Sequence, residues 1–195
     1  MVRSISNGAY LKEGYSMSIY SQDNYTQVIE RIKSKITLKN IKMGEVLSEK
    51  QILDFEEHCH IQLPQAYRIF LQEVGNGCIM VDDFPLKRLE EIELKDLSRP
   101  FMLEDAWLWE EDDELTEQEL DEKIELMVYN GEIELISIGD GMSYNLIVSG
   151  KCRGEVWNFT DVGVQPCCER QDFLGWFELW LDEQDSVDYF KDYEY

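Results

Sequence analysis

His58, Cys59 and His60 form the one place in the sequence where a thiol and imidazoles are adjacent. A cysteine paired with a histidine can act as a nucleophile, and both residue types are ligands of zinc sites. Apolar spacing places the segment at the end of a helix, where neighbouring side chains point to different faces. The other ligands of a metal site are missing nearby. We therefore interpret Cys59 as a core residue, and expect neither catalysis nor a metal here.

Carboxylates are the second chemical resource of the chain, with 41 Asp and Glu residues in all. The run Glu110 to Glu114 includes Asp112, Asp113 and Glu114, which offer oxygen ligands but lack the spaced ligands and the glycine of an EF-hand loop. Carboxylate pairs for glycoside hydrolysis are recognised only in space, so a hydrolase stays open as a distant alternative. We expect no cofactor.

Familiar catalytic motifs are absent from the sequence, including the G-x-S-x-G elbow, the P-loop, the dinucleotide fingerprint and H-E-x-x-H. The cysteines are odd in number, lack a C-x-x-C pair and indicate a reducing cytoplasm. No apolar run approaches a membrane span, and no hydrophobic signal core follows Met1. We predict a cytoplasmic protein that is not an enzyme. The cysteines are Cys59, Cys78, Cys152, Cys167 and Cys168.

The formal net charge is -23 and is unevenly distributed. Residues 1–50 hold eight Lys and Arg against five Asp and Glu, whereas Glu104 to Glu125 hold twelve acids and one base, Lys123. Such a surface repels nucleic acid and anionic membranes and attracts basic proteins. Solubility alone is the alternative explanation of this charge. The pattern favours a basic protein as partner.

The stretch from Ile133 to Phe159 organises the predicted fold. An apolar run ends at the Gly139-Asp140-Gly141 turn, and from Met142 to Ser149 the residues alternate, which together is typical of a β-hairpin. The residues of the run are Ile133, Leu135, Ile136 and Ile138. A second turn at Ser149-Gly150-Lys151 leads to a third strand, Glu155 to Phe159. This antiparallel meander needs helices to cover its apolar face.

Helical spacing appears three times before Gly77 and once after the meander. Ser48 and Gln51 form a capping box for the second helix, which ends near His60. Pro64 suits the first turn of the third helix, and Gly75-Asn76-Gly77 ends that helix. The first helix buries Tyr25, Val28, Ile29, Ile32 and Ile36, the third buries Tyr67, Phe70, Leu71 and Val74, and the last, Gln171 to Leu181, covers the sheet with Phe173, Trp176, Phe177, Trp180 and Leu181.

The middle of the chain is less regular. We expect a strand from Cys78 to Phe84, an edge strand or connection from Leu86 to Leu97, and a helix that Thr116 caps and Asn130-Gly131 ends. Two apolar groups accompany these elements. The first, predicted to be buried, is Phe101, Met102, Leu103, Ala106, Trp107 and Leu108, and the second, lining the helix, is Leu120, Ile124 and Met127 or Val128.

Several of these segments resemble the SMI1/KNR4 family, also called the SUKH superfamily. The resemblance runs from about Glu45 to Asp182, and the usual acidic residue after Leu-Pro is replaced by Gln65. The matching residues are Leu47-Ser48, Phe55-Glu56, Leu63-Pro64, Tyr67-Arg68, Phe70-Leu71, Gly75-Asn76-Gly77, Ile138-Gly139-Asp140-Gly141, Leu146-Ile147-Val148, Gly154-Glu155-Val156-Trp157, Phe173, Trp176 and Phe177.

We predict an α+β fold: a mainly antiparallel sheet with N-terminal helices and an aromatic C-terminal helix packed against it. We expect one domain over residues 23–184 with an acidic insertion at 104–130, a loose N-terminal tail at 1–22 and an acidic C-terminal tail at 185–195. Lys12-Glu13-Gly14 can be encoded by a ribosome-binding sequence at the right distance from Met17. We therefore hypothesise that translation begins at Met17.

The resemblance implies a non-catalytic binding module. Bacterial members are immunity proteins that bind and block a toxin domain, often a nuclease, whereas fungal members are regulatory scaffolds in cell-wall synthesis. The acidic charge favours an immunity protein that covers the basic cleft of a nuclease. A cytosolic interaction scaffold without a toxin remains the alternative. The predicted partner-binding residues are Trp107 and Trp109, as exposed aromatic anchors, with Glu110, Glu111, Asp112, Asp113, Glu114, Glu117, Glu119, Asp121 and Glu122.

Overall fold

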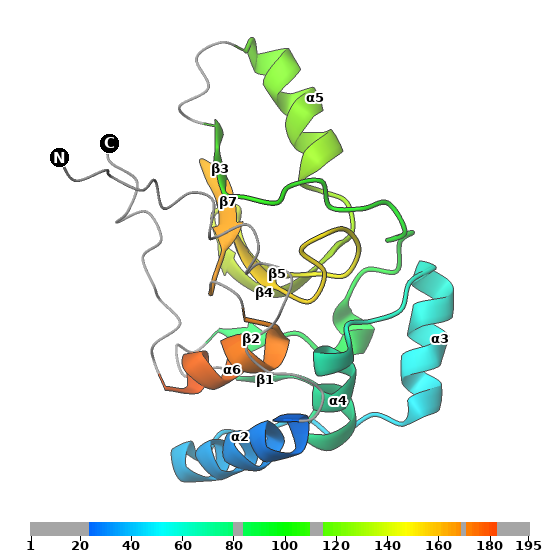
Figure 1. Ribbon diagram of the computed structural model, residues 1–195, viewed down its shortest axis with the longest axis vertical. Helices are drawn as coiled ribbons and strands as arrows, with labels where there is room; N and C mark the ends of the chain where they lie inside the picture. The colour runs from blue at the N-terminus through cyan, green and yellow to red at the C-terminus, as the bar shows by residue number, and fades with distance from the viewer. Residues whose placement is uncertain (1–23, 80–83, 110–114, 169–170, 183–195) are drawn as a thin grey trace, which may run out of the picture.

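The computed structural model describes residues 24–79, 84–109, 115–168 and 171–182, which form an α+β fold as predicted (Figure 1). The helices are α2 (Tyr25–Lys39), α3 (Glu49–Cys59), α4 (Gln65–Glu73), α5 (Glu117–Met127) and α6 (Phe173–Leu181). The strands are β1 (Cys78–Ile79), β2 (Pro85–Leu86), β3 (Trp107–Leu108), β4 (Glu132–Gly139), β5 (Met142–Ile147), β6 (Val156–Phe159) and β7 (Gly163–Pro166). A short 3-10 helix, η3, spans Leu89–Glu91.

The main sheet has the strand order β3-β7-β6-β5-β4 and is antiparallel throughout. The predicted hairpin is confirmed, with Ile133 opposite Leu146 in β4 and β5. At its turn Asp140 and Gly141 have φ of 50° and 79°, a left-handed conformation that these residue types accept. β6 continues the meander as predicted. β7 and β3 extend it by two strands that the sequence did not indicate.

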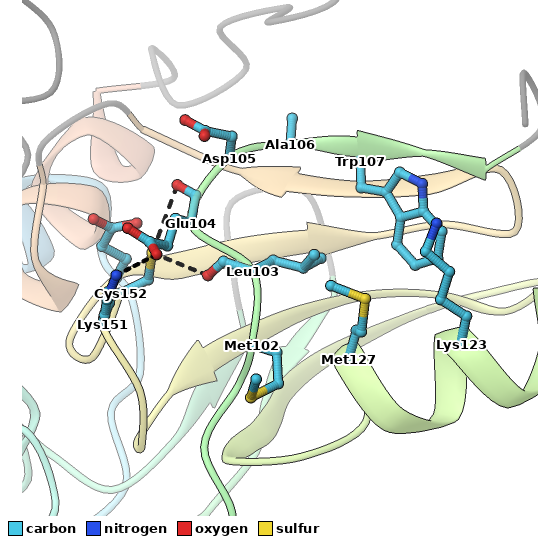
Figure 2. Close-up of a pocket in the computed structure, with 11 residues that line it drawn as sticks. Met102, Leu103, Glu104, Asp105, Ala106, Trp107, Lys123, Met127, Lys151 and Cys152 are labelled. Atoms are coloured by element: carbon cyan, nitrogen blue, oxygen red, sulfur yellow. Dashed lines mark hydrogen bonds and ion pairs between the residues drawn. The ribbon is translucent and has the colours of Figure 1, made fainter.

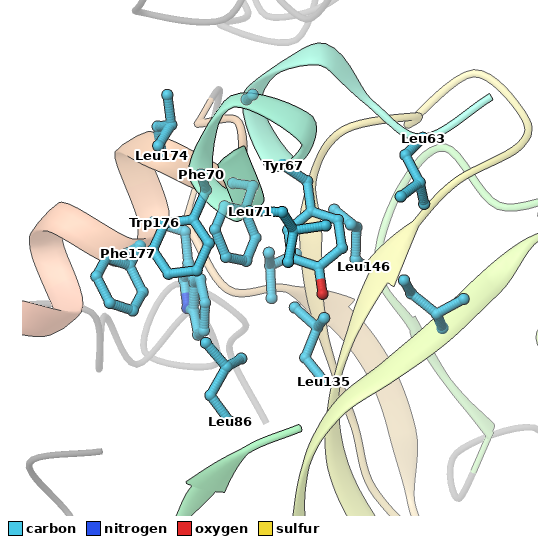
Figure 3. Close-up of a cluster of buried hydrophobic side chains, with 14 of the residues drawn as sticks. Leu63, Tyr67, Phe70, Leu71, Leu86, Leu135, Leu146, Leu174, Trp176 and Phe177 are labelled. Atoms are coloured by element: carbon cyan, nitrogen blue, oxygen red, sulfur yellow. The ribbon is translucent and has the colours of Figure 1, made fainter. Parts of the chain in front are cut away.

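Helices α4 and α6 cover one face of this sheet, α2 packs against both of them (Figure 1), and all five apolar residues predicted for the last helix are buried. Phe70 of α4 meets Phe173 and Phe177 of α6 edge to face, with ring centroids 4.9 and 4.7 Å apart. Figure 3 shows these helices beside Leu135 and Leu146 of the strands. Edge-to-face contacts add to the area-driven stabilisation of such a core. The predicted covering of the sheet by the aromatic helix is therefore confirmed.

Polar contacts fix α6 against α2. The Arg31 guanidinium donates to both carboxylate oxygens of Glu178, each at 2.9 Å, and Lys35 donates to the same carboxylate. The Tyr25 hydroxyl donates to Asp172 at 2.8 Å, at the N-terminus of α6. The Glu178 side chain is only 7% exposed, so its charge depends on these partners. α2 and α6 are thereby held in one relative position.

Glu56 connects several of the segments that resemble the SMI1/KNR4 family. This buried carboxylate accepts the backbone N–H of Leu63 at 2.6 Å and pairs with the Arg68 guanidinium. Ser48 and Gln51 form the predicted capping box of α3. Pro64 was predicted in the first turn of α4. It is the N-cap instead, and the helix begins at Gln65. The Glu56, Leu63 and Arg68 positions thus hold α3 and α4 together.

The second face of the sheet carries another core, which the acidic insertion covers. Phe101 lies 4.9 Å from Trp157, edge to face, and Leu103, Val128 and Val164 belong to the same cluster. Leu120, Ile124 and Met127 pack against it from α5. Phe101 and Leu103 are buried as predicted, but Met102 is 53% exposed, because it points away from this core into a pocket (Figure 2). The insertion is therefore part of the fold rather than a charged appendage.

Residues 78–97 contain less strand than a full strand from Cys78 to Phe84 would give. β1 pairs with β2 over two residues each, and the remaining part of the predicted strand from Cys78 to Phe84 falls largely outside the described residues. Leu86 ends β2, and beyond it the chain forms η3 and then irregular backbone, so the rest of the stretch to Leu97 is a connection, one of the two predicted alternatives. Asn76 holds this connection: its side-chain oxygen accepts the Leu89 N–H at 2.8 Å. This side-chain hydrogen bond satisfies a backbone N–H that would otherwise pair with a neighbouring strand.

Candidate protein-binding site

Helix α5 carries the predicted acidic residues that the structure describes. Thr116 caps the helix, and the Glu119 carboxylate completes a capping box by accepting the Thr116 N–H. Glu117 also lies in the first turn, where the helix dipole favours negative charge. No residue within α5 is fully buried. The helix therefore contacts the second core with one side and turns the other side to solvent.

The acidic face is defined here as the exposed acids of α5. It comprises Glu117, Glu119, Asp121, Glu122 and Glu125. Glu125 was not among the predicted partner-binding residues, and it is included because its side chain is exposed as well. The other predicted acids, Glu110, Glu111, Asp112, Asp113 and Glu114, lie outside the described residues.

The charges of the acidic face are not neutralised by bases in the part of the chain that the structure describes. None of its acids forms an ion pair with a described Lys or Arg, whereas bases elsewhere pair with structural acids. Arg68, for example, pairs with Glu56, and Lys95 with Glu132. The exposed face of α5 consequently projects its negative charge into solvent.

The two predicted tryptophan anchors behave differently. Trp109 is only 8% exposed, and its indole N–H donates to the Asp161 carbonyl at 2.8 Å. The expectation that Trp109 is exposed is therefore wrong, because the loop before β7 covers it. Trp107 is half-buried and meets Trp109 edge to face at 5.4 Å. The Lys123 ammonium lies 4.5 Å from the centre of the Trp107 ring. Trp107 remains accessible to a partner.

A pocket of about 830 Å³ adjoins Trp107, between the segment before β3, α5 and the β5–β6 connection (Figure 2). Figure 2 shows Trp107 and Lys123 at one end, Glu104 and Cys152 at the other, and Leu103 between them. Its volume falls in the range of small-ligand pockets and exceeds that of a single side chain. α5 supplies one wall of the pocket through Lys123 and Met127, so this partly apolar hollow adjoins the helix that carries the acidic face.

Two titratable groups at the pocket are strongly affected by burial. Burial raises the pKa of the Glu155 carboxyl to about 7, although it accepts a hydrogen bond from Trp157 Nε1 at 2.9 Å. Burial is the largest cause that raises the pKa of the Cys152 thiol to about 12, and nearby carboxylates, Glu155 among them, add to this increase. The thiol donates to the Leu103 carbonyl at 3.5 Å. Cys152 is therefore a protonated structural group and not an activated nucleophile.

The His58-Cys59-His60 segment has no comparable geometry. Cys59 is buried and burial raises the pKa of its thiol, whereas both histidines are exposed. His60 Nδ1 lies 3.8 Å from Asp96. Within the described residues there is no cluster of three His, Cys, Asp or Glu side chains arranged to hold a metal ion. Cys59 is a core residue, as the sequence predicted.

Sequence reasoning missed the pocket because its walls come from distant segments. Cys152 and Glu155 follow β5, about fifty residues after Glu104 and Asp105. The one available signal was Glu155, which belongs to the Gly154-Glu155-Val156-Trp157 segment noted for its family resemblance. That segment indicated a strand and not a pocket wall.

Comparisons with known proteins test the family directly. Neither the curated proteins nor the solved structures contain a match to this chain. No helix among the described ranges combines the length and apolar character needed to cross a membrane. A family model, that of the SMI1/KNR4 family (SUKH-1), matches residues 46–182. This match covers the main sheet, the second core and the helices from α3 to α6, and leaves only α2 of the described helices outside it, so the chain belongs to the SMI1/KNR4 family.

Proposed function

We propose that this protein is a cytoplasmic immunity protein that binds a cognate toxin domain and neutralises it. Membership of the SMI1/KNR4 family supports a protein-binding role. The observation that carries the proposal further is the acidic face, whose five exposed acids lack basic partners among the described residues. The partner that fits such a face is basic.

The proposed mechanism is occlusion. A nuclease holds phosphates in a basic cleft, and exposed carboxylates can occupy the same positions. The long-range field of the acidic face accelerates encounter with a basic partner, and it repels the nucleic acid that competes for the cleft. Catalysis by the immunity protein has no part in this mechanism. We therefore propose a basic nuclease domain as the partner.

The geometry supports a rigid platform for this binding. α5 rests on the second core through Leu120, Ile124 and Met127, and its N-terminus is fixed by Thr116. A surface held by a core loses little conformational entropy on binding. We propose that the pocket beside Trp107 lies at the centre of the contact and that the acids surround it.

The test is neutralisation of the toxin domain encoded by the neighbouring gene. We expect this protein to bind that domain tightly, to abolish its nuclease activity, and to lose affinity as salt is raised. Tight binding that is insensitive to salt would refute occlusion by the acidic face. Absence of binding would refute the immunity function and favour the scaffold alternative.

A further inference from the structure

The pocket beside Trp107 has an apolar middle. Leu103 is 8% exposed and belongs to the second core, and Met127 packs against that core from α5. Figure 2 shows both side chains between the two ends of the pocket. An apolar middle accepts an alkyl chain, because burying CH₂ groups there removes them from water.

Carboxyl groups outnumber ammonium groups around this middle. Glu104, Asp105 and Glu155 line the pocket together with Lys123 and Lys151. Lys151 is already paired with Glu104, and Lys123 lies over the Trp107 ring. The pocket is therefore net negative when Glu155 is ionised, and the acidic face of α5 beside it is more negative still.

The position of Lys123 indicates that the end of the pocket formed by Trp107 attracts a cation. Its ammonium lies 4.5 Å from the Trp107 ring centre, within the distance at which a cation interacts with an aromatic face. The protein thus already holds one cation of its own against this pocket wall. The pocket environment favours a positively charged group on a hydrocarbon chain.

We propose that this pocket binds an arginine side chain of the partner protein. The alkyl chain lies against Leu103 and Met127, and the guanidinium is held among the carboxyls of Glu104, Asp105 and Glu155. This inference deepens the proposed function and rests on it for the source of the arginine. The binding chemistry itself depends only on the pocket.

Arginine fits this site better than the other cationic side chain. Its planar guanidinium donates in several directions at once and so can serve more than one carboxylate. It is also more weakly hydrated than an ammonium, which lowers the cost of entering a partly apolar pocket. A lysine ammonium is a compact, strongly hydrated charge, and it would leave some of these carboxyls without a hydrogen-bond donor.

Glu155 gives independent support to the geometry. Burial raises the pKa of the Glu155 carboxyl to about 7. In the free protein its hydrogen bonds therefore offset only part of the cost of burying the ionised carboxylate. The groups that face it are the Cys152 thiol, whose proton goes to the Leu103 carbonyl, and Trp157, which donates its indole N–H. A guanidinium beside this carboxylate would supply the missing positive charge.

The experiment is a titration of the full-length, isotope-labelled protein with N-acetyl-arginine amide, followed by backbone NMR shifts. N-acetyl-citrulline amide is the matched ligand, because it keeps the shape and loses the charge. Glu155→Gln is the pocket variant, with Asp140→Asn as a control that removes an exposed acid outside the pocket. Nα-acetyl-lysine amide, which keeps its side-chain ammonium, tests whether the pocket prefers a guanidinium to an ammonium.

We expect saturable shifts at residues 102–107, 123–127 and 151–155, with citrulline binding at least about tenfold more weakly. Glu155→Gln should weaken arginine binding several-fold while Asp140→Asn leaves it unchanged. Equal binding of citrulline or of lysine, or shifts spread evenly over exposed acids, would overturn the proposal. This titration needs no toxin, so its failure is distinct from a failure to neutralise one.

Discussion

Removing charge from the acidic face tests whether that face guides association. The variant Glu117→Gln, Asp121→Asn, Glu122→Gln and Glu125→Gln neutralises four exposed acids and retains Glu119, which closes the capping box with Thr116. None of the four forms an ion pair with a base in the described ranges, so we expect the free energy of unfolding to change little.

The expected magnitude follows from Coulomb's law with screening. One pair of charges about 10 Å apart in water contributes about 0.3 kcal/mol at about 10 mM salt and about 0.1 kcal/mol at about 150 mM. If each of the four acids faces one base of the partner, the association rate should fall about eightfold at low salt and about twofold at physiological salt. The dissociation rate should change less.

The assay is stopped-flow or surface-based association with the toxin domain at both salt concentrations. The matched control removes the same total charge from exposed acids elsewhere, through Glu30→Gln, Glu45→Gln, Glu57→Gln and Asp140→Asn. An unchanged association rate at low salt would refute the reasoning. An equal loss in the control would attribute the effect to net charge and not to α5.

Three further outcomes are expected. Phe101→Ala should lower the free energy of unfolding by about 3–5 kcal/mol in urea titration, because it leaves a cavity against Trp157 in the second core; a loss below about 1 kcal/mol would contradict a packed second core. Glu178→Gln should cost about 1.5–3 kcal/mol, because Arg31 loses its charged partner, and an unchanged urea midpoint would contradict that role. For Glu155, a folded-state pKa of about 7 against 4.5 means that its contribution is present at low pH and lost as pH rises through about 7. Glu155→Gln should therefore stabilise the protein more near pH 8 than near pH 5, and an equal effect at both values would show that the carboxyl titrates normally.

Local patterns predicted the elements whose stability is decided locally. The apolar spacing of Tyr25 to Ile36 matches the buried side of α2, and the capping boxes at Ser48 and Thr116 fix the starts of α3 and α5. The β4–β5 hairpin follows from alternation and its glycine-containing turn. In each case the signal and the interaction lie within a few residues of each other.

The missed features depend on contacts between distant residues. β7 contains Gly163 and Pro166, which are unfavourable in strands, yet it pairs with β6 across the turn that Thr160 stabilises. The burial of Trp109 depends on the carbonyl of Asp161, about fifty residues away. The second core was hidden because it joins residues beside the acidic stretch, such as Leu103, to residues of the meander that are distant in the chain, such as Trp157.

The site was predicted in part for the same reason. Charge density along the chain indicated α5, whose acids are exposed. The pocket arises only where Glu104 and Trp107 meet Glu155 from another turn, and linear sequence gives no measure of that distance. Its role in binding remains a prediction.

Hydrogen–deuterium exchange of the complex with the neighbouring-gene toxin domain tests the central claim most directly. We expect binding to slow exchange in α5 and in residues 102–109, because the partner covers the acidic face and the pocket. Exchange in α2 and α3, on the opposite side of the fold, should stay unchanged. Protection of α2 or α3 with no change at α5 would contradict the proposed binding surface.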